Sequence, residues 1–240
     1  MAGQSLEGKV ALITGASSGL GRAFALALAA AGVKVFLVAR REEKLREVAR
    51  EIADAGGEAA YHVLDVRSVP ALYDAVDVLL ARFRRLDVLV NNAGLGYRAP
   101  LLEAKRSEIA AMLETDLAAA IYLSQACLNA LLRNAPSDIV NISSIAGLEG
   151  FAEGTVYCAA KAGLVGFTRA LAAELKPANI RVTAICPGSV DTEFFEDRYR
   201  PTLDRPQMLT TDDVVGALFF VLASPPNVLH GEIVLRPRRV

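Results

Sequence analysis

Tyr157 and Lys161 lie four residues apart in a segment whose apolar pattern predicts a helix over 154–175. Four residues is about one helical turn, so both side chains leave the helix on the same face. A free tyrosine has a pKa of about 10, but a neighbouring ammonium favours the phenolate and lowers that pKa. The pair could therefore exchange a proton with a carbonyl or hydroxyl oxygen. The alternative is an ordinary surface pair, because this spacing is common on helices.

Two serines, Ser143 and Ser144, close an apolar run that predicts a core strand over 137–143. If that strand end shares a cleft with Tyr157, a serine hydroxyl can donate to a carbonyl oxygen and stabilise charge developing on it. The alternative is that the serines cap or turn the chain after the strand. The sequence allows both roles, one for each serine.

Three glycines with the spacing G-x-x-x-G-x-G follow a predicted strand over 9–14 and precede an Ala-rich helical segment. A turn without side chains lets a pyrophosphate approach the backbone, and the unpaired N–H groups and positive dipole end of the new helix face the same point. The spacing differs from G-x-G-x-x-G, so the prediction rests on the flanking strand and helix. The turn comprises Gly15, Ser17, Ser18, Gly19, Leu20 and Gly21.

Predicted strands and helices alternate along the whole chain. Strands are expected near 9–14, 33–39, 59–64, 87–91, 137–143, 180–186 and 231–235, and helices near 19–31, 41–55, 69–84, 103–133, 154–175 and 211–223. The runs 35–38 and 88–90 are apolar without alternation, which is typical of parallel strands buried on both faces. We predict an α/β fold, a doubly wound sheet of about seven parallel strands with helices on both faces. The expected order is 3-2-1-4-5-6 with a seventh strand appended, and ligands would gather at the carboxyl ends of the strands.

Length and composition narrow the class of protein. The 240 residues fit one α/β domain over 1–240, and 53% hydrophobic residues predict a large core. A net charge of -1 argues against broad nucleic-acid binding, and the charges within every apolar stretch argue against a membrane span. The N-terminus lacks a secretory pattern, and the distant Cys127, Cys158 and Cys186 fit reduced thiols, so we expect a cytoplasmic protein. His62 and His230 are isolated, and no metal site is expected.

In chain order these motifs resemble those of the short-chain dehydrogenase/reductase family. The resemblance runs from about residue 8 to residue 236 and rests on Thr14-Gly15-x-x-x-Gly19-x-Gly21, Asn91-Asn92-Ala93-Gly94, Ser144, Tyr157-x-x-x-Lys161 and Pro187-Gly188. It implies a Rossmann-type oxidoreductase that uses a nicotinamide dinucleotide. Tyr157 would be the general acid in reduction or the base in oxidation. Lys161 would lower the pKa of Tyr157 and bind the nicotinamide ribose, and Ser144 would hold the substrate oxygen.

The resemblance also implies which residues surround the cofactor. Asp65 and Val66 would lie by the adenine, and the ribose side would be lined by Asn92, Ala93 and Gly94. The turn Pro187-Gly188 would face the cofactor, and Val190 and Thr192 would meet the nicotinamide carboxamide.

Asp116 is a departure from the family pattern, since many members carry an asparagine there that supports a water relay to the lysine. An aspartate can serve if the relay depends on a backbone carbonyl, whereas a relay through the amide would be slowed. An ionised Asp116 near Lys161 would also compete for the charge of the lysine. Asp116 is therefore an uncertain member of the catalytic set.

The residues after the predicted second strand bear on the choice of cofactor. Ala39 stands where an NAD-preferring site commonly places an acid that holds the ribose hydroxyls. Arg40 and Arg41 follow at the start of a helix, where cations oppose the helix dipole. A guanidinium can grip a 2′-phosphate through several hydrogen bonds, and pairing with nearby glutamates is the alternative. We expect NADP(H) to be preferred, with NAD(H) as the second choice.

The leading interpretation is NADPH-dependent reduction of a small carbonyl compound, or the reverse alcohol oxidation, by hydride transfer with Tyr157 as proton donor. A 3-oxoacyl thioester reductase is one alternative and would need a basic entrance, for which Arg133 and Arg169 are candidates. An NADP(H)-binding sensor or scaffold with little turnover is the alternative of another class. The apolar helices predict a homodimer or homotetramer, and residues 193–210 predict a mobile substrate loop.

Overall fold

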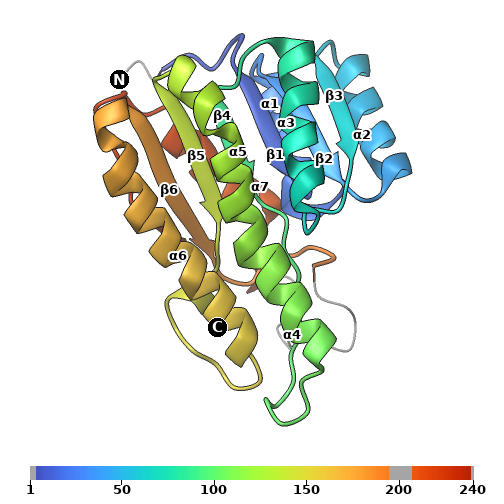
Figure 1. Ribbon diagram of the computed structural model, residues 1–240, viewed down its shortest axis with the longest axis vertical. Helices are drawn as coiled ribbons and strands as arrows, with labels where there is room; N and C mark the ends of the chain where they lie inside the picture. Colours follow the sequence, from blue (N-terminus) through green and yellow to red (C-terminus); the bar gives the residue numbers. More distant parts are fainter. Residues whose placement is uncertain (1–3, 195–206, 239–240) are drawn as a thin grey trace.

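A computed structural model of the chain describes residues 4–194 and 207–238. These residues contain a seven-stranded, wholly parallel sheet in the order β3-β2-β1-β4-β5-β6-β7, as predicted (Figure 1). Each end of every strand lies within one residue of its predicted position. The strands are β1 (Val10–Thr14), β2 (Lys34–Ala39), β3 (Ala59–Val63), β4 (Val88–Asn91), β5 (Ser137–Ile142), β6 (Ile180–Pro187) and β7 (Glu232–Leu235).

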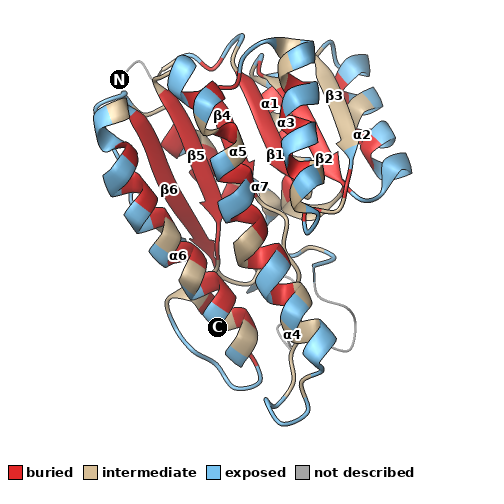
Figure 2. Ribbon diagram, in the orientation of Figure 1, coloured by how far each residue is buried: buried red, intermediate tan, exposed pale blue. Residues whose placement is uncertain are grey.

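Helices cover both faces of the sheet. One face carries α1 (Gly19–Ala30), α2 (Glu42–Asp54) and α7 (Thr211–Leu222), and the other carries α3 (Val69–Phe83), α5 (Ala119–Arg133) and α6 (Thr155–Leu175). The central strands β1, β4, β5 and β6 are therefore buried along their whole length (Figure 2). This double cover explains the uninterrupted apolar runs 10–13 of β1 and 88–90 of β4.

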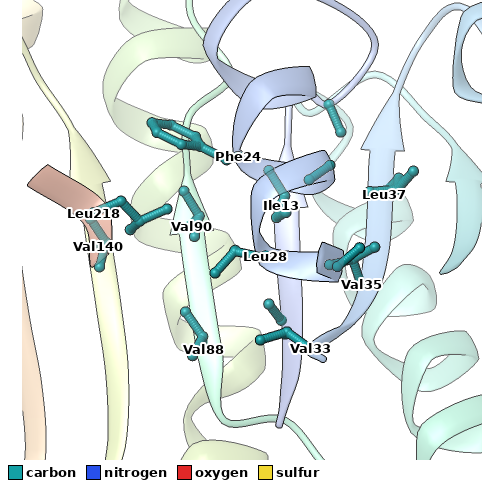
Figure 3. Packing of buried hydrophobic residues seen from close by; sticks show 14 of the residues in the cluster. Ile13, Phe24, Leu28, Val33, Val35, Leu37, Val88, Val90, Val140 and Leu218 are labelled. Carbon is teal, nitrogen blue, oxygen red and sulfur yellow. The ribbon is translucent and has the colours of Figure 1, made fainter. Parts of the chain in front are cut away.

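Successive residues of one strand belong to two different cores. Ile13 of β1 packs with Phe24 and Leu28 of α1 on one face (Figure 3). Leu12, the preceding residue, packs with Leu72 and other side chains on the opposite face. Side chains alternate across a strand, so each central strand stabilises both layers of helices at once.

The predicted helix over 103–133 begins later and is less regular than expected. It starts at α4 (Arg106–Leu113), widens into the π-helical segment η1 (Glu114–Ala118) and continues as α5. The prediction of one regular helix is wrong here because a π-helical segment has no signature in residue types. π-helical segments are rare and occur frequently at functional sites, and this one carries Asp116.

Among the described residues, one continuous helix, Arg106–Arg133, is long and apolar enough to cross a membrane by length and composition. Half of its most apolar window is buried inside the protein. Core helices of soluble proteins meet the same criterion, so the match is weak evidence for a membrane span.

A buried ion pair joins two strands at the edge of the sheet where their amino ends lie. Arg181 of β6 donates from Nε to Asp138 Oδ1 of β5 at 2.7 Å, and both side chains are buried. The other guanidinium nitrogens donate to carbonyls at or beyond the end of α7, including those of Leu222 and Ser224. The last carbonyls of a helix have no partner within the helix, so Arg181 both ties α7 to the sheet and satisfies its end.

Arg181→Met is expected to lower the free energy of unfolding by about 3–5 kcal/mol, because it leaves a buried carboxylate and several carbonyls without their partner. Denaturant unfolding followed by circular dichroism measures the loss. Arg50→Met is the control, because Arg50 is highly exposed and forms a surface ion pair with Asp54 across one turn of α2. Equal effects of the two substitutions would contradict the role given to Arg181.

Candidate active site

Most of the site segments predicted from the sequence follow the carboxyl end of a strand. Gly15 follows β1, Arg40 follows β2, Asn92 follows β4, Ser143 follows β5 and Gly188 follows β6. All strands are parallel, so these segments meet at one edge of the sheet. Ligands of doubly wound sheets bind at this edge.

Tyr157 and Lys161 lie in the first two turns of α6, and both are nearly buried, with 7% and 4% of their surface exposed. Lys161 Nζ lies 5.8 Å from the centre of the Tyr157 ring. The Ser144 hydroxyl lies close enough to the Tyr157 phenol to oppose the rise in its pKa that burial causes. The structure therefore brings together the three side chains that the sequence analysis assigned to chemistry.

The two serines after β5 have different contacts. Ser143 Oγ donates to the carbonyl oxygen of Lys161 at 3.0 Å, which fixes the loop against α6. Ser144 Oγ accepts from the amide of Ala146 at 3.1 Å and so caps the short 3-10 helix η2 (Ile145–Gly147). Ser144 thus combines the capping role with a position beside Tyr157, whereas Ser143 is structural.

Lys161 is held at its ammonium by two elements besides its own helix. Its Nζ donates to the Ile142 carbonyl at the end of β5, at 3.1 Å, and forms an ion pair with Asp116 Oδ1 at 3.0 Å. Asp116 is itself buried, and the Leu95 amide donates to its two carboxylate oxygens at 3.3 and 3.2 Å. The ammonium therefore has a fixed position between β5 and η1.

Gly94 permits this arrangement through its lack of a side chain. A Cβ at Gly94 would lie 2.7 Å from Asp116 Oδ1 and 3.4 Å from Lys161 Nζ. The first distance is shorter than real Cβ contacts, so a larger residue would displace the carboxylate. Gly94, the last residue of the Asn-Asn-Ala-Gly motif, therefore lies against the ion pair between Asp116 and Lys161.

Burial and charge act in opposite directions on this group of residues. Burial raises the pKa of Tyr157 above its ordinary value; the Lys161 charge and the Ser144 hydrogen bond oppose the rise, and the Asp116 charge adds to it. Burial disfavours the Lys161 ammonium, but the charges of Asp116 and Tyr157 outweigh it, so the pKa of Lys161 is raised. Burial likewise raises the pKa of Asp116 against the pull of Lys161 and the Leu95 amide. Lys161 thus acts on Tyr157 in the expected direction, but burial outweighs it.

The glycine turn after β1 packs tightly against the motif after β4. Gly15 has a positive φ of 67°, and a Cβ there would lie 2.9 Å from Asn92 Nδ2. A Cβ at Gly21 would overlap the Gly15 carbonyl. Asn92 Nδ2 donates to the Thr14 carbonyl at 2.9 Å, so the asparagine ties two strand ends together. Asn92 therefore has a structural role between β1 and β4.

Asn91 also has a structural role, in the interior of the sheet. Its Nδ2 donates to Asn141 Oδ1 of β5 at 2.8 Å and to Ser124 Oγ of α5 at 3.1 Å. Asn141 in turn donates to Thr168 Oγ1 of α6 at 2.9 Å. These hydrogen bonds connect the two strands and the two helices that surround Lys161.

The Arg41 side chain reaches back over the glycine turn. It donates to Ser17 Oγ from Nη2 at 3.0 Å and to Ser18 Oγ at 2.6 Å. Pairing with glutamates was the alternative, but Glu42 pairs with Arg46 and Glu47 with Lys44 instead. Arg40 is exposed beside it.

The remaining predicted cofactor residues surround the same edge. Asp65 forms hydrogen bonds with Arg67, which lower its pKa, and Val66 is buried in the core. Thr192 lies over Gly19, because a Cβ at Gly19 would be 3.5 Å from Thr192 Cβ. The other predicted residues lie in the same region. Leu20 packs against the core at the start of α1, and the Ala93 amide donates to Thr14 Oγ1. Pro187 ends β6, the Gly188 amide donates to the Leu235 carbonyl, and Val190 forms a β-bridge with Leu209.

A small apolar cluster flanks Tyr157. Met112 is buried against Tyr157, and Leu95 and Tyr97 pack on the pair. The centres of the Phe194 and Tyr157 rings lie 6.1 Å apart. Of the predicted substrate loop, residues 195–206 lie outside the described part of the chain.

Several groups of the site were not identified from the sequence. The Ile142 carbonyl and the Leu95 amide hold the ion pair, but backbone groups have no residue signature. The proximity of Phe194 to Tyr157 depends on the path of the loop after β6, which no motif indicates.

Arg133 and Arg169 do not form a basic entrance. Arg133 is the last residue of α5. The first residue of α5 follows η1 and lies near Asp116, so Arg133 lies at the opposite edge of the sheet. Arg169 pairs with Glu232 of β7 at 2.6 Å, which balances its charge. These two residues therefore do not supply the basic entrance that a carrier-bound thioester substrate would need.

Comparisons with known proteins agree with this geometry. A short chain dehydrogenase family model matches residues 9–202. An NADP-dependent 3-hydroxy acid dehydrogenase of Schizosaccharomyces pombe is 32% identical, over 97% of this chain and 93% of its own. The structure matches an alcohol dehydrogenase from the archaeon Thermococcus sibiricus, complexed with 5-hydroxy-NADP, with 32% identity, a TM-score of 0.89 and 97% of both chains covered. It also matches a carveol dehydrogenase from Mycobacterium avium in complex with NAD, with 29% identity, a TM-score of 0.88 and 97% and 96% of the chains covered.

Proposed function

The chain belongs to the short chain dehydrogenase family, and we propose that it is an NADPH-dependent oxidoreductase that reduces a carbonyl group of a small molecule or oxidises the corresponding alcohol. One observation carries the proposal. A tyrosine, a serine and a lysine with the chemistry of proton transfer lie together at the ligand-binding edge of the sheet, next to a glycine turn.

The glycine turn fits a dinucleotide. Gly15 and Gly21 carry no side chain, and a Cβ at either position would collide with neighbouring atoms, so the tight turn requires glycine at both. Ser18 is the N-cap of α1, and its side chain makes no capping hydrogen bond. The first N–H groups of a helix are unpaired within the helix and attract a phosphate.

Arg41 supports a preference for NADP(H). β2 ends at Ala39 without the acid that commonly holds the ribose hydroxyls in NAD sites. The Arg41 guanidinium lies on the hydroxyls of Ser17 and Ser18, where a 2′-phosphate could accept hydrogen bonds from all three side chains. The NAD complex of one structural relative keeps NAD(H) as the alternative cofactor.

The chemistry follows from the positions of three side chains. The nicotinamide, when bound, supplies or accepts the hydride. Ser144 donates a hydrogen bond to the substrate oxygen, and Tyr157 gives its phenolic proton to that oxygen during reduction. Lys161 balances the charge of the phenolate that remains. The burial of Tyr157 and Lys161 keeps water from competing for these contacts.

Tyr157→Phe is expected to lower the turnover number by about 100- to 10,000-fold, because it removes the proton donor. The measurement is NADPH consumption with a panel of aldehydes, ketones and diketones. Tyr73→Phe is the control, since the Tyr73 hydroxyl lies on the exposed side of α3 and bonds Gln125. Full activity of Tyr157→Phe would refute the mechanism, and NADPH binding by the wild-type protein without any turnover would favour a sensor.

Arg41→Ala is expected to weaken NADPH binding by about 10- to 100-fold and to leave NADH binding nearly unchanged, because it removes hydrogen bonds from a charged group to the phosphate. The chain contains no tryptophan, so the fluorescence of the bound nucleotide itself can be titrated. Arg50→Ala, on an exposed face of α2, is the control. An equal loss for both nucleotides would contradict a 2′-phosphate contact.

We also propose a homodimer or homotetramer, because α5 leaves Ile121 and Tyr122 exposed on its outer face. Light scattering after size exclusion should give two or four times the monomer mass, and Tyr122→Glu should lower it. Val63→Glu, at a similarly exposed apolar position on β3, should leave the mass unchanged. A wild-type monomer at micromolar concentration would refute this assembly.

A further inference from the structure

The ammonium of Lys161 lies near two acidic side chains, Asp116 and Tyr157, which compete for its charge. Asp116 lies 3.0 Å from its Nζ, whereas the Tyr157 ring centre lies 5.8 Å away. All three side chains are buried. A lone ammonium at this place would stabilise the Tyr157 phenolate, but the Asp116 carboxylate offsets part of that effect because its negative charge disfavours the phenolate.

We propose that Asp116 withholds the charge of Lys161 from Tyr157 and thereby keeps the Tyr157 phenol protonated through neutral pH. The site then works as a reductase at neutral pH and oxidises alcohols only in alkaline solution. This inference rests on the proposed function and adds a direction to it. Asp116 acts through Lys161, so it is a positioning residue and not a catalytic one.

The contacts of the pair favour its ionised form. The Asp116 carboxylate accepts from the Leu95 amide as well as from Lys161, and Lys161 also donates to the Ile142 carbonyl. An ion pair in the interior persists when hydrogen bonds satisfy the remaining oxygens and protons, as they do here. Lys161 and the Leu95 amide oppose the rise that burial causes in the pKa of Asp116, and the raised pKa of Lys161 keeps the ammonium charged, so we take the pair as ionised at neutral pH.

Other titratable groups near the pair do not replace Asp116. Cys186 of β6 acts on Lys161, and burial raises the pKa of this thiol to about 11, so it is uncharged at neutral pH. Cys158 follows Tyr157 on α6 and packs, with Tyr97, against the apolar cluster around the phenol. The Ser144 hydroxyl opposes the rise in the pKa of the phenol but carries no charge. Asp116 is therefore the carboxylate in direct contact with the ammonium.

The proton balance explains why the protonation of Tyr157 sets the direction. In reduction, the carbonyl carbon gains a hydride and the carbonyl oxygen gains the phenolic proton, which leaves a tyrosinate that solvent reprotonates. Oxidation is the reverse and must start from the tyrosinate. A phenol that stays protonated at neutral pH serves the first reaction and limits the second.

The test is a pH titration of tyrosinate absorbance in the near ultraviolet on the protein without nucleotide. The chain has six tyrosines, so the Tyr157 signal is obtained by subtracting Tyr157→Phe from wild type, and the double variant from Asp116→Asn. Asp116→Asn keeps the shape of the side chain and removes the charge. The midpoint for Tyr157 should fall by about one pH unit or more.

Two controls separate charge from structure. Glu47→Gln removes a carboxylate that pairs with Lys44 on the surface of α2 and should not move the midpoint. Asp116→Ser is a second neutral variant, measured in the same way in case Asp116→Asn does not fold. The wild-type protein is itself a test, because its Tyr157 midpoint should lie at or above the ordinary value of about 10.

The kinetic arm uses NADPH with the best substrate of the carbonyl panel, and NADP with the corresponding alcohol. In Asp116→Asn, the alkaline limb of reduction and the acid limb of oxidation should both move to lower pH by the shift seen in absorbance. A purely structural role of Asp116 would lower rates without moving either limb.

The outcomes separate this inference from the proposed function. If Tyr157→Phe is inactive, either of two results would overturn the inference alone. The first is a wild-type midpoint well below 10. The second is a neutral variant whose midpoint does not fall, or that shows no tyrosinate transition before alkaline unfolding. Full activity of Tyr157→Phe would instead overturn the proposed function. A lower midpoint in the neutral variants supports the inference whichever substrate is found.

Discussion

The ion pair between Asp116 and Lys161 is the interaction on which the geometry of the site depends. Removing two charges from water is costly, and their attraction offsets that cost only when the geometry is good and the remaining hydrogen-bonding groups are satisfied. Here the missing partners are backbone groups, the Ile142 carbonyl and the Leu95 amide. The pair is therefore stable only if β5, the segment after β4, η1 and α6 keep their relative positions.

The sheet and a buried polar network supply that constraint. Asn91 and Asn141 lie opposite each other in the register of β4 and β5, and their side chains bond each other and reach Ser124 of α5 and Thr168 of α6. A polar network inside a low-dielectric core favours one arrangement, because a shift would break these hydrogen bonds and leave further polar groups without partners. The strands that carry the site are thus locked to the helices that complete it.

The sequence predicts the sheet well and the site partly, for physical reasons. The strand Val88–Asn91 contains an uninterrupted apolar run, as expected of a strand buried on both faces. Tyr157 and Lys161 are separated by one helical turn, so their common face follows from spacing alone. η1 has no such signal, because the residues of 112–120 that face the core keep an α-helical spacing through the π segment. Contacts through backbone groups, such as the Ile142 carbonyl, are not encoded by residue type at all.

Glycines outside the dinucleotide turn carry information about the ion pair that motif analysis did not use. A glycine in a helix interior is less favourable than alanine by about 1 kcal/mol, so its presence needs a packing reason. A Cβ at Gly163, two residues after Lys161, would lie 2.8 Å from Leu117 Cδ2, next to Asp116. Gly163 therefore lets α6 approach η1 closely enough for a short carboxylate to reach the ammonium. Gly94, in the segment after β4, leaves room for the same Asp116 carboxylate. The two glycines and the ion pair therefore pack together as one unit.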